Sequence, residues 1–148
     1  MPEEDLKFSA AEVDLLLHAT EDAGKVLQSI QNVLSVPSER FSTTPSEGHY
    51  NNKILLLKAM LSSQEAVELA LRIMSLLNRS DRDHLSSLLP EYSDEKGNLY
   101  LRLDKQLICH GKVSLSERDS IRVRFRPVKR YRSSGNLESY RGLFSSTE

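Results

Sequence analysis

The chain has 148 residues, of which 39% are hydrophobic and 28% charged; this suits one folded domain, or one with an appendage. Aromatic residues make up only 6% and Trp is absent, which argues against a large enzyme core. The single cysteine, Cys109, excludes an internal disulfide and predicts an intracellular location, in cytoplasm or nucleus. No apolar run approaches the roughly 20 residues of a membrane helix, and the acidic N-terminus does not resemble a signal peptide.

Charge is distributed unevenly along the chain, although the net charge is only −1. Residues 1–97 carry nine Lys and Arg against sixteen Asp and Glu, whereas residues 98–148 carry eleven against five. An acidic half and a basic half predict two surfaces with different partners, unless the two halves pair with each other.

A heptad pattern of apolar residues covers residues 13–34 and recurs over residues 56–77. The first copy comprises Val13, Leu16, Thr20, Ala23, Leu27, Ile30 and Leu34. Such 3-4 spacing places all these side chains along one side of a helix. Ser9 and Glu12 match the capping box that begins many helices. We therefore predict a helix over residues 10–34, preceded by a flexible N-terminus over residues 1–8.

Residues 35–51 contain Pro37, Pro45 and Gly48 and predict a linker before a second helix over residues 52–78. A second apolar stripe runs beside its heptad positions, so one partner helix could not cover the whole apolar surface. The candidate contacts with a protein partner are the heptad residues Leu56, Met60, Val67, Ala70, Met74 and Leu77. The alternative is that these side chains form the core of the chain's own helical domain.

After the second helix, a short third helix is predicted between Ser80 and Pro90. From residue 99 onwards apolar residues alternate with polar ones, which predicts short strands. These lie at residues 99–103, 106–110, 113–115 and 121–125. The expected fold is α+β: an antiparallel, coiled-coil-like helical hairpin over residues 9–90, a small antiparallel sheet over residues 91–132 and a disordered tail over residues 133–148.

The last predicted strand is strongly basic and has no acidic residue between positions 122 and 132. Its first three arginines alternate, so they share one face of the strand. Positive charge of this kind can neutralise phosphates, with Tyr131 stacking on a base. The alternatives are an acidic protein surface, the acidic helices of the same chain, and plain solvation. The candidate residues are Arg122, Arg124, Arg126, Lys129, Arg130 and Arg132.

No phosphate-binding loop, dinucleotide-binding, zinc-protease or nucleophile-elbow motif is present. Cys109 and His110 are adjacent on a predicted strand and would point to opposite faces. We therefore predict a protein without catalytic residues, metal or cofactor. The predicted function is that of an assembly or adaptor subunit, which binds other protein subunits or itself through its helices and does not contact a membrane. The alternative is a nucleic-acid- or chromatin-binding protein that uses the basic strand.

Overall fold

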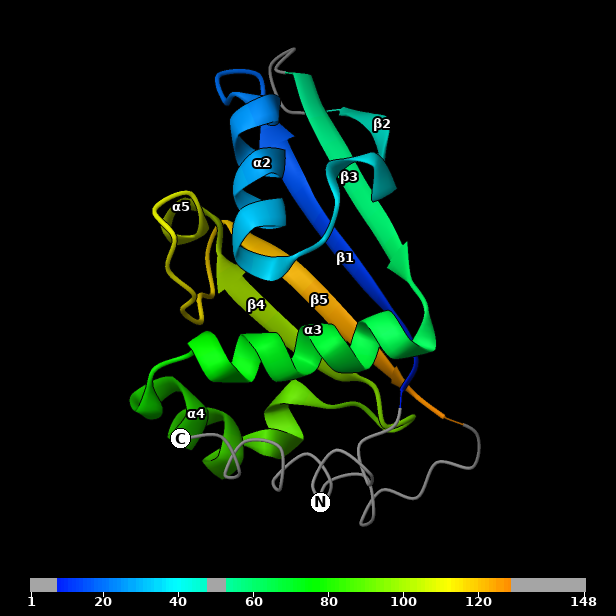
Figure 1. Cartoon of the computed structure of the whole chain (residues 1–148), viewed down its shortest axis with the longest axis vertical. Helices are drawn as coiled ribbons and strands as arrows, with labels where there is room; N and C mark the ends of the chain where they lie inside the picture. Colours follow the sequence, from blue (N-terminus) through cyan, green and yellow to red (C-terminus); the bar gives the residue numbers. More distant parts are fainter. Residues whose placement is uncertain (1–7, 48–52, 129–148) are drawn as a thin grey trace.

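A single antiparallel sheet of five strands, in the order β2-β3-β1-β5-β4, underlies the fold (Figure 1). The computed structural model describes residues 8–47 and 53–128. The central strand β1 pairs with β3 on one side and with β5 on the other, so both halves of the chain meet in one sheet. The strands are β1 (Phe8–His18), β2 (Phe41–Glu47), β3 (Lys53–Leu61), β4 (Leu99–Asp104) and β5 (Ser120–Pro127).

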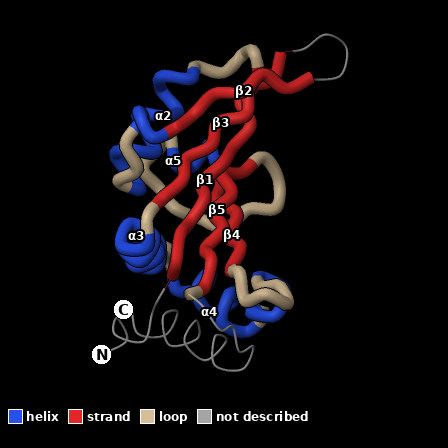
Figure 2. The backbone as a smooth tube through the Cα atoms, turned by 90° about the vertical axis from the view of Figure 1, so that its right-hand side faces the viewer, coloured by secondary structure: helices blue, strands red, loops and turns tan. Residues whose placement is uncertain are grey.

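Two amphipathic helices, α2 (Ala23–Leu34) and α3 (Ser63–Leu76), lie against the same face of the sheet (Figure 2). They follow directly after β1 and β3, and Arg72 of α3 donates a hydrogen bond of 2.6 Å to the carbonyl of Val33 in α2. The core fills the space between these helices and the sheet. Shorter elements connect the rest of the chain: α4 (Arg79–Ser87), α5 (Lys105–Ile108) and two 3-10 turns, η1 (Ser38–Arg40) and η3 (Leu89–Tyr92).

Alternation along the strands separates a buried face from an open one. On β1, Val13, Leu15 and Leu17 are buried under the helices, whereas Asp14 and Leu16 face the other way. The same alternation runs along β5, where Val123 is buried between two arginines. No helix of the described residues is long and apolar enough to cross a membrane.

The predicted helical hairpin is wrong, because each heptad segment is a strand followed by a helix. Residues 10–34 hold most of β1, a turn and α2, and residues 52–78 hold β3 and α3. The leucine triplets at residues 15–17 and 55–57 are apolar at consecutive positions, so they fit a helical period as well as an alternating one. Each heptad pattern contains one polar residue, and it lies at the junction between strand and helix: Thr20 is in the turn before α2, and Ser63 is the first residue of α3.

The predicted linker and separate C-terminal sheet are also wrong. Residues 35–51 contain η1 and the edge strand β2. The strands predicted at residues 99–103 and 121–125 exist as β4 and β5, but they extend the sheet that β1 and β3 begin. Residues 106–110 form most of α5 and a turn, not a strand.

The remaining expectations are the short third helix and the flexible ends of the chain. The short helix expected after Ser80 is confirmed as α4, which begins two residues earlier, at Arg79, with Asn78 as its cap. The tail predicted over residues 133–148 and all but the last residue of the predicted N-terminus lie outside the described residues.

Candidate functional site

The face of the sheet opposite α2 and α3 carries a band of charged side chains. Strand register places Lys58 of β3, Arg122 of β5 and Arg102 of β4 in the row that crosses β1 at Asp14. The next row crosses β1 at Glu12 and includes Met60, Arg124 and Tyr100. Arg126 stands opposite Ala10 in a third row. These three rows form what we call the arginine face: Glu12, Asp14, Lys58, Met60, Tyr100, Arg102, Arg122, Arg124 and Arg126.

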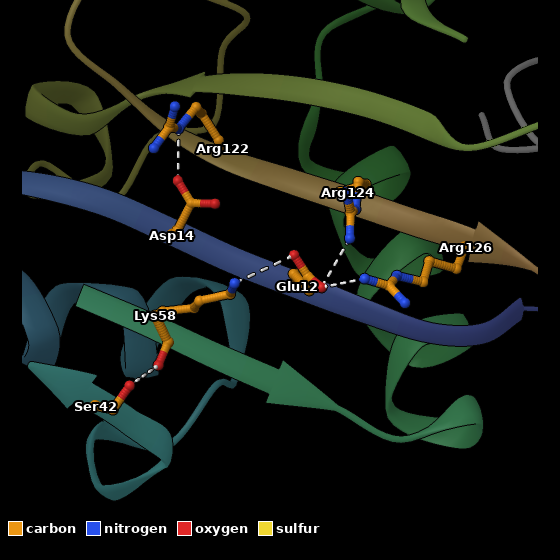
Figure 3. A network of polar contacts seen from close by, with 7 residues as sticks. All are labelled: Glu12, Asp14, Ser42, Lys58, Arg122, Arg124 and Arg126. Atoms are coloured by element: carbon orange, nitrogen blue, oxygen red, sulfur yellow. Dashed lines mark hydrogen bonds and ion pairs between the residues drawn. The ribbon is translucent and has the colours of Figure 1, made fainter. Parts of the chain in front are cut away.

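Glu12 is the centre of the ion-pair network on this face (Figure 3). One of its carboxylate oxygens accepts hydrogen bonds from Arg124 at 2.8 Å and from Arg126 at 2.6 Å. The other lies 3.7 Å from the Nζ of Lys58. Three cationic side chains thus surround one carboxylate and cover it, leaving Glu12 only 7% exposed on the face opposite α2 and α3.

The arginine face has more cations than carboxylates. Asp14 forms an ion pair with Arg122 at 2.5 Å and is the second of only two carboxylates in the three rows, against five cations. Among the described residues, Arg102 has no ion-pair partner. The paired arginines remain accessible as well, with side-chain exposures of 49% for Arg122 and 45% for Arg126. The face can therefore attract and contact an anionic partner.

A groove of about 1190 Å³ opens at the β4 end of the arginine face. One wall is the sheet, with Tyr100, Arg102 and Arg124. The other wall is formed by α4 and η3, with His84 and Tyr92. Asp81 fixes α4 beside the sheet, since its carboxylate accepts hydrogen bonds from the backbone N–H of Leu115 and the hydroxyl of Ser114, both at 3.1 Å.

Tyr100 is held in place by the turn that precedes β4. Its hydroxyl donates a hydrogen bond of 2.8 Å to Asp94, whose carboxylate also accepts from Asn98 and from the backbone N–H of Lys96. Burial on its own would raise the pKa of Asp94, but these hydrogen bonds outweigh it and the pKa lies below its usual value. The ring of Tyr100 is therefore fixed at one end while 38% of the residue stays exposed.

A second polar cluster lies where the turn after β1 meets the segment before β5. The ammonium group of Lys105, which is fully buried, lies 2.8 Å from Glu21 and 2.8 Å from Asp119. Donor atoms of His18, Glu21 and Asp119 lie within 4.8 Å of one another, a spacing that can hold a metal ion. Here the lysine already supplies the positive charge to both carboxylates, and it also donates to the carbonyl of Leu16. The cluster therefore links α5 to the turn after β1 and to the segment before β5.

The structure places the residues of the predicted basic patch in two groups. Arg122, Arg124 and Arg126 lie together on one face of β5, but their ion-pair partners are on β1 rather than on acidic helices. Lys129, Arg130 and Arg132 lie outside the described residues. Sequence reasoning missed Lys58, Arg102 and Tyr100, which strand pairing brings to the same face. Alternation along residues 99–103 already placed Tyr100 and Arg102 on one side of a strand, and only the pairing with β5 was unknown.

The six predicted partner contacts are divided between the two sides of the sheet. Val67, Ala70, Met74 and Leu77 belong to α3 or follow it and face the core, three of them buried. Leu56 and Met60 lie on β3 at outward positions, and Met60 is 49% exposed. A role of these six residues in contacting a protein partner stays an untested prediction.

Comparison with known proteins shows the family of the chain. A family model described as RNA binding matches residues 10–126, which span the sheet and its helices, so the chain belongs to this RNA-binding family. It is 34% identical over 116 residues to RNA-binding protein PAB1135 from Pyrococcus abyssi, covering 74% of this chain and 75% of that protein. The predicted coiled-coil fold is therefore wrong, and the family supports the alternative of a nucleic-acid-binding protein rather than the predicted adaptor.

Solved structures have the same fold. Protein AF2318 from Archaeglobus fulgidus matches with a TM-score of 0.78 and 28% identity, covering 93% of this chain and 99% of that one. The DUF54 protein Mth689 from Methanothermobacter thermautotrophicus matches with a TM-score of 0.77 and 25% identity, covering 95% and 100%. The sheet with α2 and α3 on one face is thus shared with proteins of the DUF54 group.

Proposed function

We propose that this protein binds RNA through the arginine face, and that it acts by binding rather than by catalysis. The observation that carries the proposal is the excess of cations over carboxylates across four adjacent strands, β3, β1, β5 and β4, on the face opposite α2 and α3. Membership of a family described as RNA binding, and the likeness to RNA-binding protein PAB1135, support it. An RNA-binding role also agrees with the intracellular location predicted from the sequence.

The mechanism is phosphate neutralisation by fixed guanidinium groups. Most protein contacts with nucleic acid go to phosphate and sugar, and each neutralised phosphate releases condensed counterions. An arginine held by a carboxylate keeps further N–H donors for a phosphate, because a guanidinium has five donors. Glu12 and Asp14 therefore position Arg122, Arg124 and Arg126 without occupying all their donors. Arg102 has no ion pair among the described residues, so it can contact a phosphate without sharing its donors with a carboxylate.

The test is the affinity of the protein for a fluorescein-labelled RNA hairpin, measured by fluorescence anisotropy at low salt. Arg102→Gln removes one cation of the arginine face without stripping an ion pair among the described residues. Lys25→Gln on α2 removes the same charge from an exposed side chain on the other side of the sheet. We expect Arg102→Gln to weaken binding several-fold and Lys25→Gln to leave it nearly unchanged.

Two outcomes would contradict the proposal. Wild-type protein that fails to bind the hairpin at low salt would remove the RNA-binding role itself. Equal losses in the two variants would show that overall charge, and not the arginine face, governs the binding. Because Arg102 and Lys25 are both exposed, we expect the two variants to fold, and circular dichroism is the check.

A further inference from the structure

We propose that the groove beside α4 holds one unpaired RNA base, stacked on Tyr100, while the neighbouring phosphates lie on the arginine face. This inference rests on the proposed function and names the part of an RNA that the site prefers. The protein would then bind an RNA with an unpaired nucleotide more tightly than a fully paired one.

The first argument is the shape and position of the groove. Its volume of about 1190 Å³ is ample for a base, since small-molecule pockets begin at about 300 Å³. It is continuous with the arginine face, because Arg102, Arg122 and Arg124 line it. A strand whose phosphates follow that face can therefore turn one base into the groove without leaving its cationic contacts.

Aromatic side chains on both walls form the second argument. Tyr100 presents its ring from the sheet, and its hydrogen bond to Asp94 fixes that ring before any ligand arrives. On the opposite wall His84 and Tyr92 meet edge to face, with centroids 5.9 Å apart and an interplanar angle of 77°. Aromatic rings on which a base can stack are the usual means of holding unpaired nucleotides.

The third argument is that the charges in the groove suit a base and not a phosphate. Five carboxylates and three guanidinium groups line it, so the groove, unlike the arginine face as a whole, has no excess of cations to hold a phosphate, whereas a base is neutral. Glu91 and Glu117 are exposed there and can accept hydrogen bonds from the amino and imino groups of a base. Burial raises the pKa of Tyr92, and these two carboxylates with Asp81 raise it further, so its hydroxyl stays protonated as a donor.

The experiment compares two fluorescein-labelled hairpins by anisotropy: one with a fully paired stem, and the same hairpin with a single unpaired guanosine in the stem. Wild type is tested beside Tyr100→Ala, which removes the ring, and Tyr100→Phe, which keeps the ring and loses the hydrogen bond to Asp94. We expect wild type to bind the bulged hairpin about tenfold more tightly than the paired one. Tyr100→Phe should keep a smaller preference for the bulge, because it keeps the ring but loses the hydrogen bond that fixes it. Tyr100→Ala should bind both equally, at the paired affinity of wild type.

Each other outcome is decisive as well. Equal wild-type affinities for the two hairpins would overturn this inference and leave the proposed function standing. A Tyr100→Ala variant that keeps its preference for the bulge, or that weakens both hairpins equally, would also overturn it. Failure of wild type to bind either hairpin would overturn the proposed function together with this inference. Tyr100 is exposed, so we expect both variants to fold, and circular dichroism is the check.

Discussion

At the scale of single residues, Glu12 and Lys105 stand out because each is a buried charge surrounded by opposite charges. Glu12 is covered by the cations that it attracts, and Lys105 by two carboxylates and a carbonyl. Removing one member of such a group leaves the others close together without compensation, which costs more than the pair itself contributes. Substitution of either residue should therefore lower the stability of the fold, although only Glu12 belongs to the proposed RNA surface.

Substituting Glu12 by Gln should lower the free energy of unfolding by about 1–2 kcal/mol. The loss is smaller than for a fully buried pair, because Arg124, Arg126 and Lys58 are partly exposed and solvent screens their repulsion. Asp14→Asn is the matched control, since Asp14 pairs with one arginine only, and it should cost below about 1 kcal/mol. Urea denaturation measures both; equal losses would contradict the special position of Glu12.

Substituting Lys105 by Met should lower the free energy of unfolding by about 2–3 kcal/mol, because Glu21 and Asp119 lose their shared cation. Burial would raise the pKa of Glu21, but hydrogen bonds from Lys105 and the backbone of His18 outweigh it, and that pKa is lowered. A lowered pKa in the folded state stabilises the protein above the unfolded value, near pH 4.5, and this stability is lost as the pH falls further.

The pH dependence provides the control for Lys105. In wild type, thermal stability should fall as the pH is lowered from about 5 to about 3, and the contribution of Glu21 should disappear in Lys105→Met. Lys25→Met removes an exposed lysine of α2 and should keep the wild-type profile. A Lys105→Met profile parallel to that of wild type would show that Glu21 does not depend on this lysine.

At the scale of elements, the strand–helix junctions decide the architecture, and their signals are short. Ser62 accepts a hydrogen bond from the backbone N–H of Glu65, and the Glu65 side chain accepts from the N–H of Ser62, which forms a capping box. Asp22 caps α2 through the N–H of Lys25. The pattern alone does not identify a helix start, because Ser9 and Glu12 have the same spacing as Ser62 and Glu65 but lie in β1.

The cap of α3 leads to a prediction on stability. Ser62→Ala should lower the free energy of unfolding by about 1 kcal/mol, because the N–H of Glu65 loses its acceptor. Ser63→Ala, one residue further on and also exposed, should change it by a few tenths of a kcal/mol at most. Thermal denaturation of the two variants measures both losses. A larger loss of stability for Ser63→Ala than for Ser62→Ala would show that the helix begins elsewhere.

The same junctions explain how far the sequence could predict the fold and the candidate site. Alternation identified β4 and β5, because Leu99, Leu101 and Leu103 are separated by polar residues. It failed for β1 and β3, where residues 15–17 and 55–57 are apolar on both faces. The arginines of β5 were found for the same reason as the strand. Their pairing with Glu12 and Asp14, more than a hundred positions away, depends on the sheet order and has no local signal.

At the scale of the whole molecule, the two faces of the sheet separate folding from binding. The helices α2 and α3 bury one face and form the core, while in the part of the chain that the structure describes neither of them covers the arginine face (Figure 2). The net charge of the chain is −1, so attraction to RNA cannot come from its total charge. At physiological ionic strength, charges are screened beyond about 8 Å, and an RNA at the arginine face is affected mainly by the cations of that face.

Salt dependence therefore tests the proposed surface as a whole. The logarithm of the hairpin affinity should fall linearly with the logarithm of salt concentration, in spite of the negative net charge. Arg102→Gln should reduce this slope by about 1, since one phosphate contact is lost. Tyr100→Ala should leave the slope unchanged while lowering the affinity for the bulged hairpin, because stacking releases no counterions. A slope near zero in wild type would mean that the arginines are neutralised by Glu12 and Asp14 and do not contact phosphate.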